Sequence, residues 1–415
     1  MMRTQRCKGS QDLFSKEMRG FRSITDTFRD CCLKSGYEEV RTPTLEYLHL
    51  FTSTGTLTPG MLSKVYSFLD WDGWSGERVV LRPDCTIPVA RLYVEGMKDR
   101  ELAKLCYVAN VFSFEATGEE TREKWQGGAE LIGAGSPLAD VELMVLALEV
   151  LKKLGLSGIA LRLSHAGLIR ALITRLGLSS REQSRLFSRI LDGDVEALTR
   201  LKSGISKVDA ALIPLLKLRG ESPGLLRNLR ALVAYEFPEF RQPLDNFISI
   251  VELVEQLGYS YEIDITSGRG FEYYTGIIFQ FFVDGEKVGG GGRYDALIPL
   301  MGGRETPASG FALYFDYLMK LVKGNNLSKP AAQEVLVRAE PKAIKEGFDV
   351  AACLRSAGYI AQLHLGGAEP AKVRWTLDVR NEAPKFVIAD RSKNKSVEVN
   401  DIADILKVLG GGRCQ

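Results

Sequence analysis

The sequence predicts an α+β fold, built from an antiparallel sheet flanked by helices and followed by a small α/β domain. An antiparallel strand pair is indicated by the aromatic and β-branched residues from Tyr273 to Val283, the turn Asp284-Gly285 and a return segment. Helical apolar spacing dominates residues 166–258, which predicts a helical insertion. After a linker-like stretch at 324–330, short strands and helices alternate through the tail.

Length and composition are those of an ordinary globular protein. The 415 residues suffice for two or three domains, and 45% are hydrophobic while 26% are charged. A net charge of +2 implies no broad attraction to nucleic acid. Seven scattered cysteines without a C-x-x-C pair, and only three histidines, argue against a disulfide framework and a metal site. No secretory leader or membrane-spanning run is evident, so we expect a cytoplasmic protein.

The segments before the insertion read as alternating helices and strands. Apolar spacing predicts a helix over 11–35 that ends at Gly36, after which a short strand leads to Pro43. The other elements expected in this part are strands at 66–70 and 79–81, a helix over 87–96, strands at 104–114 and 122–133, a helix from Ser136-Pro137 to Gly155, and a strand at 159–164.

The segments after the hairpin predict one more helix and then the tail. A loop at 303–310 is expected to precede an apolar helix over 311–322. The tail is expected to contain strands at 335–339, 360–364, 385–389 and 396–399, with helices at 342–356 and 402–409.

The return strand of the hairpin ends in four glycines, Gly289 to Gly292. Glycine weakens a strand, but it permits close approach of the backbone to a flat or bulky group. Arg269, Tyr273 and Tyr274 lie near the start of the facing strand. This combination predicts a small-molecule pocket on a sheet, with an irregular hairpin end as the alternative.

Two further pairs of polar residues are candidates for the same pocket. Asp84 and Thr86 stand between a strand and a helix, where they could bind a ligand ammonium group or cap the helix. Gln126 and Glu130 are separated by an even number of residues, so they share one face of a strand. If that face is buried, both side chains need polar partners, and the alternative is two solvated positions.

Five motifs along the chain resemble those of the class II aminoacyl-tRNA synthetases, and specifically those of the histidyl branch. LRPDCT resembles LRPEGT, REKWQGGAELIG resembles REFHQ-x-G-x-E-x-x-G, and GRGFEYYTG resembles RGLDYYNRT. FSFE and GGGGRYDALI are similar to FRHE and AGGRYDGLV. The resemblance covers about residues 8–322 and implies a class II synthetase-like antiparallel sheet. It divides the chain into a core at 1–165 and 259–323, a helical insertion at 166–258, and a tail domain at 331–415.

The motifs depart from the synthetase pattern at two arginines. The arginine of FRHE, which binds the α-phosphate of ATP in that family, is Ser113 here. The arginine of GFAMGLERL is Tyr317 in the matching sequence GFALYFDYL. Neither hydroxyl matches a guanidinium for binding phosphate, so the resemblance implies a chain without catalytic residues or a cofactor.

The positions of the family's amino-acid pocket keep residues of a suitable chemical type in this chain. The positions that match the histidine-binding residues of the family are Asp84, Thr86, Gln126, Glu130, Arg269, Tyr273 and Tyr274. Loss of the nucleotide chemistry with retention of this pocket is typical of the regulatory subunits of short-form ATP phosphoribosyltransferase. That resemblance implies a hetero-octamer with the catalytic subunit, self-association as a dimer, and feedback inhibition of histidine biosynthesis by histidine. The alternative is a divergent histidine–tRNA ligase.

The tail domain resembles the anticodon-binding domain of the synthetases, but between Gly367 and Lys385 it reads as shortened by a helix and a strand. Together with the near-neutral charge, this argues against tRNA as a partner.

Overall fold

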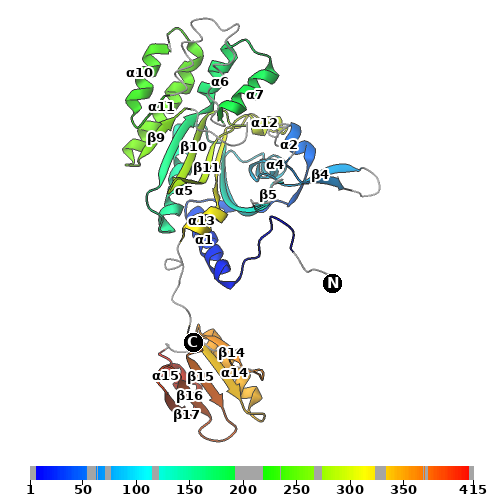
Figure 1. Cartoon of the computed structure of the whole chain (residues 1–415), viewed down its shortest axis with the longest axis vertical. Coiled ribbons are helices and arrows are strands. Elements are labelled where there is room, and N and C mark those ends of the chain that lie inside the picture. The colour runs from blue at the N-terminus through cyan, green and yellow to red at the C-terminus, as the bar shows by residue number, and fades with distance from the viewer. Residues whose placement is uncertain are drawn as a thin grey trace. The chain divides into compact units, whose positions relative to one another are not determined.

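A computed structural model describes residues 6–53, 62, 64–70, 76–114, 121–191, 218–233, 235–265, 273–322, 333–367, 369 and 373–410. The chain forms two compact units, Met1–Leu327 and Ser328–Gln415, and each is described separately below. Figure 1 shows the elements of both units.

The first unit is built on a large sheet, which is antiparallel through its centre and has parallel pairs near both edges. In spatial order its strands are β1 (Glu38–Glu39), β5 (Ala103–Phe112), β6 (Glu123–Ile132), β12 (Ala308–Tyr314), β11 (Glu286–Arg293), β10 (Ile277–Val283), β7 (Ala160–His165), β9 (Tyr261–Asp264) and β8 (Arg219–Gly220). The hairpin between β10 and β11 turns at Asp284 and Gly285, both with positive φ, as the sequence predicts.

Two hydrophobic clusters cover the two faces of this sheet, because successive strand residues point to opposite sides. On β5, Cys106 joins the cluster formed with α1 (Ser15–Lys34), α5 (Pro137–Lys153) and α11 (Arg241–Gln256). Its neighbours Leu105 and Tyr107 join the cluster formed with α4 (Thr86–Gly96) and α12 (Leu297–Leu300). The sheet is therefore the middle layer of the unit.

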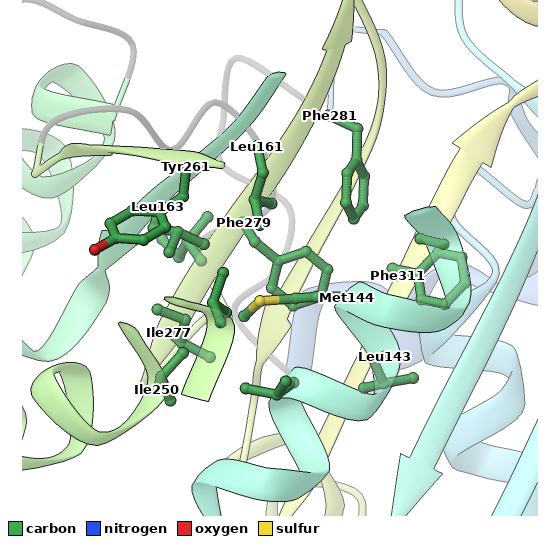
Figure 2. Packing of buried hydrophobic residues seen from close by; sticks show 14 of the residues in the cluster. Leu143, Met144, Leu161, Leu163, Ile250, Tyr261, Ile277, Phe279, Phe281 and Phe311 are labelled. Atoms are coloured by element: carbon green, nitrogen blue, oxygen red, sulfur yellow. The ribbon is translucent and has the colours of Figure 1, made fainter. Parts of the chain in front are cut away.

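The first cluster is the larger one, and Figure 2 shows part of it. Leu143 and Met144 of α5 face Phe279 of β10 and Phe311 of β12, and Ile250 of α11 lies beside Ile277 of β10. A small second sheet, β2 (Leu45–Tyr47), β4 (Glu77–Leu81) and β3 (Ser67–Asp70), and the helix α2 (Leu48–Ser53) complete this part of the unit.

The segment expected to be a helical insertion contains α6 (Ala166–Arg175), α7 (Ser180–Leu191), α10 (Pro223–Val233), the short 3-10 helix η2 (Pro238–Phe240) and α11. Figure 1 shows these helices gathered at one end of the large sheet. Leu226 and Phe247 join the same core as α5. The segment also contributes β8, which pairs with β9 and extends the sheet.

Several predicted boundaries in the first unit are wrong: α1 begins at Ser15 and not at residue 11, and the loop expected at 303–310 ends where β12 begins, at Ala308. The strand expected from Tyr273 begins only at Ile277, so Tyr273 and Tyr274 lie in the approach to β10. The helix expected over 311–322 is a strand, β12, up to Tyr314, and only then a helix, α13 (Phe315–Leu321). Because β12 is a central strand packed on both faces, its apolar run lacks the alternation that distinguishes a strand from a helix.

Within its described residues, the second unit is a five-stranded sheet with two helices. Its strand order is β14 (Ile360–Leu363), β13 (Glu334–Ala339), β15 (Trp375–Val379), β16 (Phe386–Asp390) and β17 (Lys395–Val399), and α14 (Ile344–Ser356) and α15 (Ile402–Val408) pack on it. The strand β15 lies between Gly367 and Lys385, where the sequence reads as lacking one. That reading is wrong for the strand, and the short apolar alternation of β15 was too weak a signal to predict it.

Candidate functional site

The central strands of the large sheet form a floor of very small side chains. Cross-strand pairing places Glu130, Gly310, Gly292 and Ile278 in one row, and Gly128, Ala312, Gly290 and Gln280 in the next. A Cβ on Gly292 would lie 2.8 Å from the ring of Tyr274, and one on Gly128 would lie 2.3 Å from the hydroxyl of Tyr107. Gly292 and Gly128 therefore allow tyrosines to lie directly against the backbone, and for Gly292 this is the close approach that the glycine run predicts.

Glu130 is buried at the end of this floor, with only 1% of its surface exposed. Its Oε1 accepts hydrogen bonds from Thr86 Oγ1 at 2.8 Å and from the hydroxyl of Tyr107 at 3.4 Å. Its Oε2 accepts a hydrogen bond from the hydroxyl of Tyr294. Every one of these donors is a neutral hydroxyl.

Asp84 is the second buried carboxyl group of the site. Its Oδ1 accepts a hydrogen bond from the backbone N–H of Ile87 at 2.9 Å, in the first turn of α4. Its Oδ2 accepts one from the hydroxyl of Tyr273 at 3.5 Å. One oxygen therefore caps the helix, as one of the two interpretations predicts, while the other faces the pocket and leaves ligand binding a prediction.

A cavity of about 60 Å³ lies over the glycine floor. It brings together most of the predicted residues, namely Asp84, Thr86, Gln126, Tyr273 and Tyr274. Glu130 joins them through its hydrogen bond to Thr86. Gln126 and Glu130 are both buried on one face of β6, so the even spacing gave the correct geometry. Arg269 lies outside the described residues, as does Glu115.

Sequence reasoning missed three tyrosines of this site. Tyr107 and Tyr294 donate hydrogen bonds to Glu130, and Tyr314 lines the cavity at the end of β12. The ring of Tyr273 lies 5.0 Å from that of Tyr274 and 5.7 Å from that of Tyr294, in edge-to-face contacts. The motif G-G-R-Y-D could have indicated Tyr294 as a site residue. Nothing in the sequence distinguishes Tyr107 from the other residues of a buried strand.

Burial controls the ionisation of both carboxyl groups. It raises the pKa of Asp84 to about 6 and that of Glu130 to about 8. The hydrogen bonds to Asp84 from the backbone N–H of Ile87, and those to Glu130 from the hydroxyls of Tyr294 and Thr86, only partly oppose this. In the described part of the chain no lysine or arginine forms an ion pair with either group. The site thus contains two carboxyl groups that a positively charged ligand would favour in their ionised form.

A buried ion pair holds the strand that carries Tyr294. The guanidinium of Arg293 donates to both oxygens of Asp140, at 3.1 and 2.9 Å, and to Asp295 Oδ1 at 3.0 Å. Asp140 belongs to α5 and is fully buried. This network connects the end of β11 to the opposite layer and fixes the position of Tyr294 next to it.

The two departures from the synthetase motifs lie at strand and helix ends. The backbone N–H of Ser113, just after β5, donates to the carbonyl of Arg122 at 2.9 Å. Tyr317 lies in α13, and its ring centroid is 6.4 Å from that of Tyr314.

The described residues contain no cluster of histidine, cysteine and acidic side chains suited to a metal ion. None of the helices within the described ranges is long and apolar enough to cross a membrane.

Comparison with known proteins places these features in a family. The model of the histidyl-tRNA synthetase family matches residues 9–318. A relative from Dehalococcoides mccartyi, named ATP phosphoribosyltransferase regulatory subunit, is 46% identical over 98% of both chains. A histidine–tRNA ligase from Methanocaldococcus jannaschii is 31% identical over 91% of this chain and 89% of its own.

A solved structure from Bacillus halodurans, described as an ATP phosphoribosyltransferase regulatory subunit/histidyl-tRNA synthetase, has the same fold. It superposes with a TM-score of 0.78 and 26% sequence identity, covering 92% of this chain and all of that one. The class II synthetase-like fold expected from the sequence is thereby confirmed.

Proposed function

The chain belongs to the histidyl-tRNA synthetase family, and within it to the ATP phosphoribosyltransferase regulatory subunits, and we propose on this premise that it is a histidine-binding regulatory subunit. Its role is to activate a short-form ATP phosphoribosyltransferase catalytic subunit and to make that enzyme sensitive to inhibition by histidine. The observation that carries the proposal is the pair of buried carboxyl groups, Asp84 and Glu130, in a tyrosine-lined cavity.

The chemistry of the cavity suits a small zwitterion with an aromatic side chain. Asp84 faces the cavity with one oxygen and can accept hydrogen bonds from an α-ammonium group, as can the side-chain oxygen of Gln126. Glu130 lies among the rings of Tyr107 and Tyr294, and a carboxylate that already accepts three hydrogen bonds can accept another from an imidazole N–H. In this orientation the ligand's α-carbon lies toward Asp84 and its ring toward Glu130. Thr86 donates a hydrogen bond to Glu130 and Tyr273 donates one to Asp84, and Arg269 is proposed to meet the carboxylate.

We infer that this chain performs no catalysis of its own. Ser113 and Tyr317 replace the two arginines that the synthetase motifs use on ATP. A preorganised positive charge at a phosphate is typically worth a factor of about 10²–10³ in rate, and a hydroxyl does not supply it. Two such replacements at one site remove the basis for amino-acid activation, so the ligase alternative has little support.

The proposed partner is the short-form catalytic subunit, in a hetero-octamer in which this chain also pairs with itself through its synthetase-like core. These assignments rest on the family resemblance. The cytoplasm is the proposed location, supported by six cysteines in the described ranges that form no disulfide. We propose no role for tRNA. The strand β15 is one of the two elements that the tail was expected to lack, so the argument against tRNA now rests mainly on the net charge of only +2.

Reconstitution tests the proposal. The purified chain is mixed with a short-form catalytic subunit from the same source, and formation of phosphoribosyl-ATP is followed with and without this chain. We expect activity to depend on the mixture. A parallel assay measures histidine-dependent exchange of pyrophosphate into ATP by this chain alone. Exchange activity without any stimulation of the transferase would refute the regulatory role in favour of the ligase.

A further inference from the structure

We propose that Tyr314 is a specificity-determining residue that closes the α-carbon end of the pocket, so that the site accepts a free amino acid and rejects one with a large substituent on its carboxyl group. The inference rests on the proposed function, because it uses the orientation of histidine argued above.

The position of Tyr314 follows from the pairing of β12 with β6. Glu130 pairs with Gly310, Gly128 with Ala312, and Gln126 with Tyr314. All six residues point to the pocket face of the sheet, because they are separated by even numbers along their strands. On that face of β12 the side chains are therefore a hydrogen, a methyl group and then a phenol ring. Tyr314 is the first large side chain that a ligand lying along β12 would meet.

The spacing along the strands sets the length of the pocket. Four residues separate Glu130 from Gln126, and at roughly 3.3 Å per residue the row of Tyr314 stands about 13 Å from the row of Glu130. That distance fits an amino acid with its side chain at Glu130 and its ammonium at Asp84. A group attached to the carboxyl would extend toward Tyr314.

The surroundings of Tyr314 hold its ring in place. It lines the cavity together with Asp84 and Gln126, and its ring centroid is 6.4 Å from that of Tyr317 in α13. In the motif GFAMGLERL the position of Tyr314 is a glycine and that of Tyr317 is an arginine. Of these two tyrosines, Tyr314 lines the cavity, and Tyr317 packs against it from α13. Both replacements disfavour a ligand that carries a group on its carboxyl, since the loss of the arginine removes phosphate binding and the ring of Tyr314 fills space.

Three ligands of graded size test the inference by titration calorimetry on the full chain. They are histidine, histidinamide, which lacks the carboxylate charge but adds no bulk, and histidine benzylamide, which adds a ring to the same amide. For the natural protein and for Tyr314→Phe, which keeps the ring, we expect benzylamide to bind about tenfold or more weakly than histidinamide. For Tyr314→Ala and Tyr314→Gly we expect the two amides to bind within about threefold of each other.

The outcomes separate this inference from the proposed function. If the natural protein binds no histidine, the proposed function fails and the inference with it. If it binds histidine and also binds both amides equally well, only the role of Tyr314 is overturned. The role is also overturned if Tyr314→Ala and Tyr314→Gly fold like the natural protein and yet still discriminate between the amides, or no longer bind histidine itself. The comparison between the natural protein and Tyr314→Phe stands even if the small variants do not fold.

Discussion

Gly310 on β12 lies directly opposite Glu130 on β6, and a Cβ atom on Gly310 would meet Oε2 of Glu130 at 1.7 Å. The same oxygen accepts the hydrogen bond from Tyr294. The absence of a side chain at position 310 is therefore a condition for the buried carboxyl group to occupy its place in the pocket.

Gly310→Ala is the first test of this relationship. The added methyl group must displace Glu130 or the strand, and such overpacking costs about 1–3 kcal/mol. We expect histidine affinity to fall about tenfold or more in calorimetry. Gly96→Ala is the matched control, since a Cβ at Gly96, the last residue of α4, would meet no atom within 4 Å. Equal histidine affinity in both variants would show that Glu130 is not part of the site.

Histidine affinity should rise as the pH increases from 6 to 8. Burial raises the pKa of Asp84 to about 6 and that of Glu130 to about 8, and a bound cation favours the ionised form of each. Binding therefore releases protons in this range, and a one-proton coupling changes affinity by up to about tenfold per pH unit. Calorimetry in buffers of different ionisation enthalpy counts these protons. Glu130→Gln should release fewer, and an unchanged proton count in that variant would contradict the assignment.

The free energy of unfolding should depend on pH in the opposite direction, and fall as the pH rises. Glu130 has an ordinary pKa of 4.5, and burial in the folded chain raises its pKa to about 8, so the native state binds the extra proton between these values. The free energy of unfolding consequently falls as the pH rises from about 4.5 to about 8, at up to about 1.4 kcal/mol per unit. Glu130→Gln removes this loss, and we expect it to be more stable than the natural protein at pH 8.5 and similar at pH 5. Denaturant unfolding at the two pH values measures the difference, and parallel profiles would count against a buried neutral Glu130.

Arg293→Met should destabilise the protein strongly. It leaves Asp140, which is fully buried, without its bidentate partner, and removing one member of a buried pair costs about 3–5 kcal/mol. The neighbouring Tyr294 loses its anchor, so histidine binding should weaken as well. Arg230→Met is the control, because the pair of Arg230 with Asp245 is exposed and should matter little. Similar unfolding curves for the two variants would show that the buried pair does not hold this end of β11.

The residues of the pocket were predictable where a local rule determines their geometry. The period of two along a strand put Gln126 and Glu130 on one face, and the run Gly289–Gly292 indicated close backbone approach. Tyr107 was not predictable in this way, since its contact with Glu130 depends on the pairing of two strands. β12 was mistaken for a helix because a strand buried on both faces has no alternation to read.

The most direct test of the central claim is a histidine titration of the reconstituted transferase. The short-form catalytic subunit is assayed with the natural chain, with Glu130→Gln and with the control Gly96→Ala. We expect histidine to inhibit the complexes with the natural and control chains alike. The complex with Glu130→Gln should need about tenfold or more histidine for half inhibition. If all three complexes are inhibited at the same histidine concentration, the pocket described above does not sense histidine.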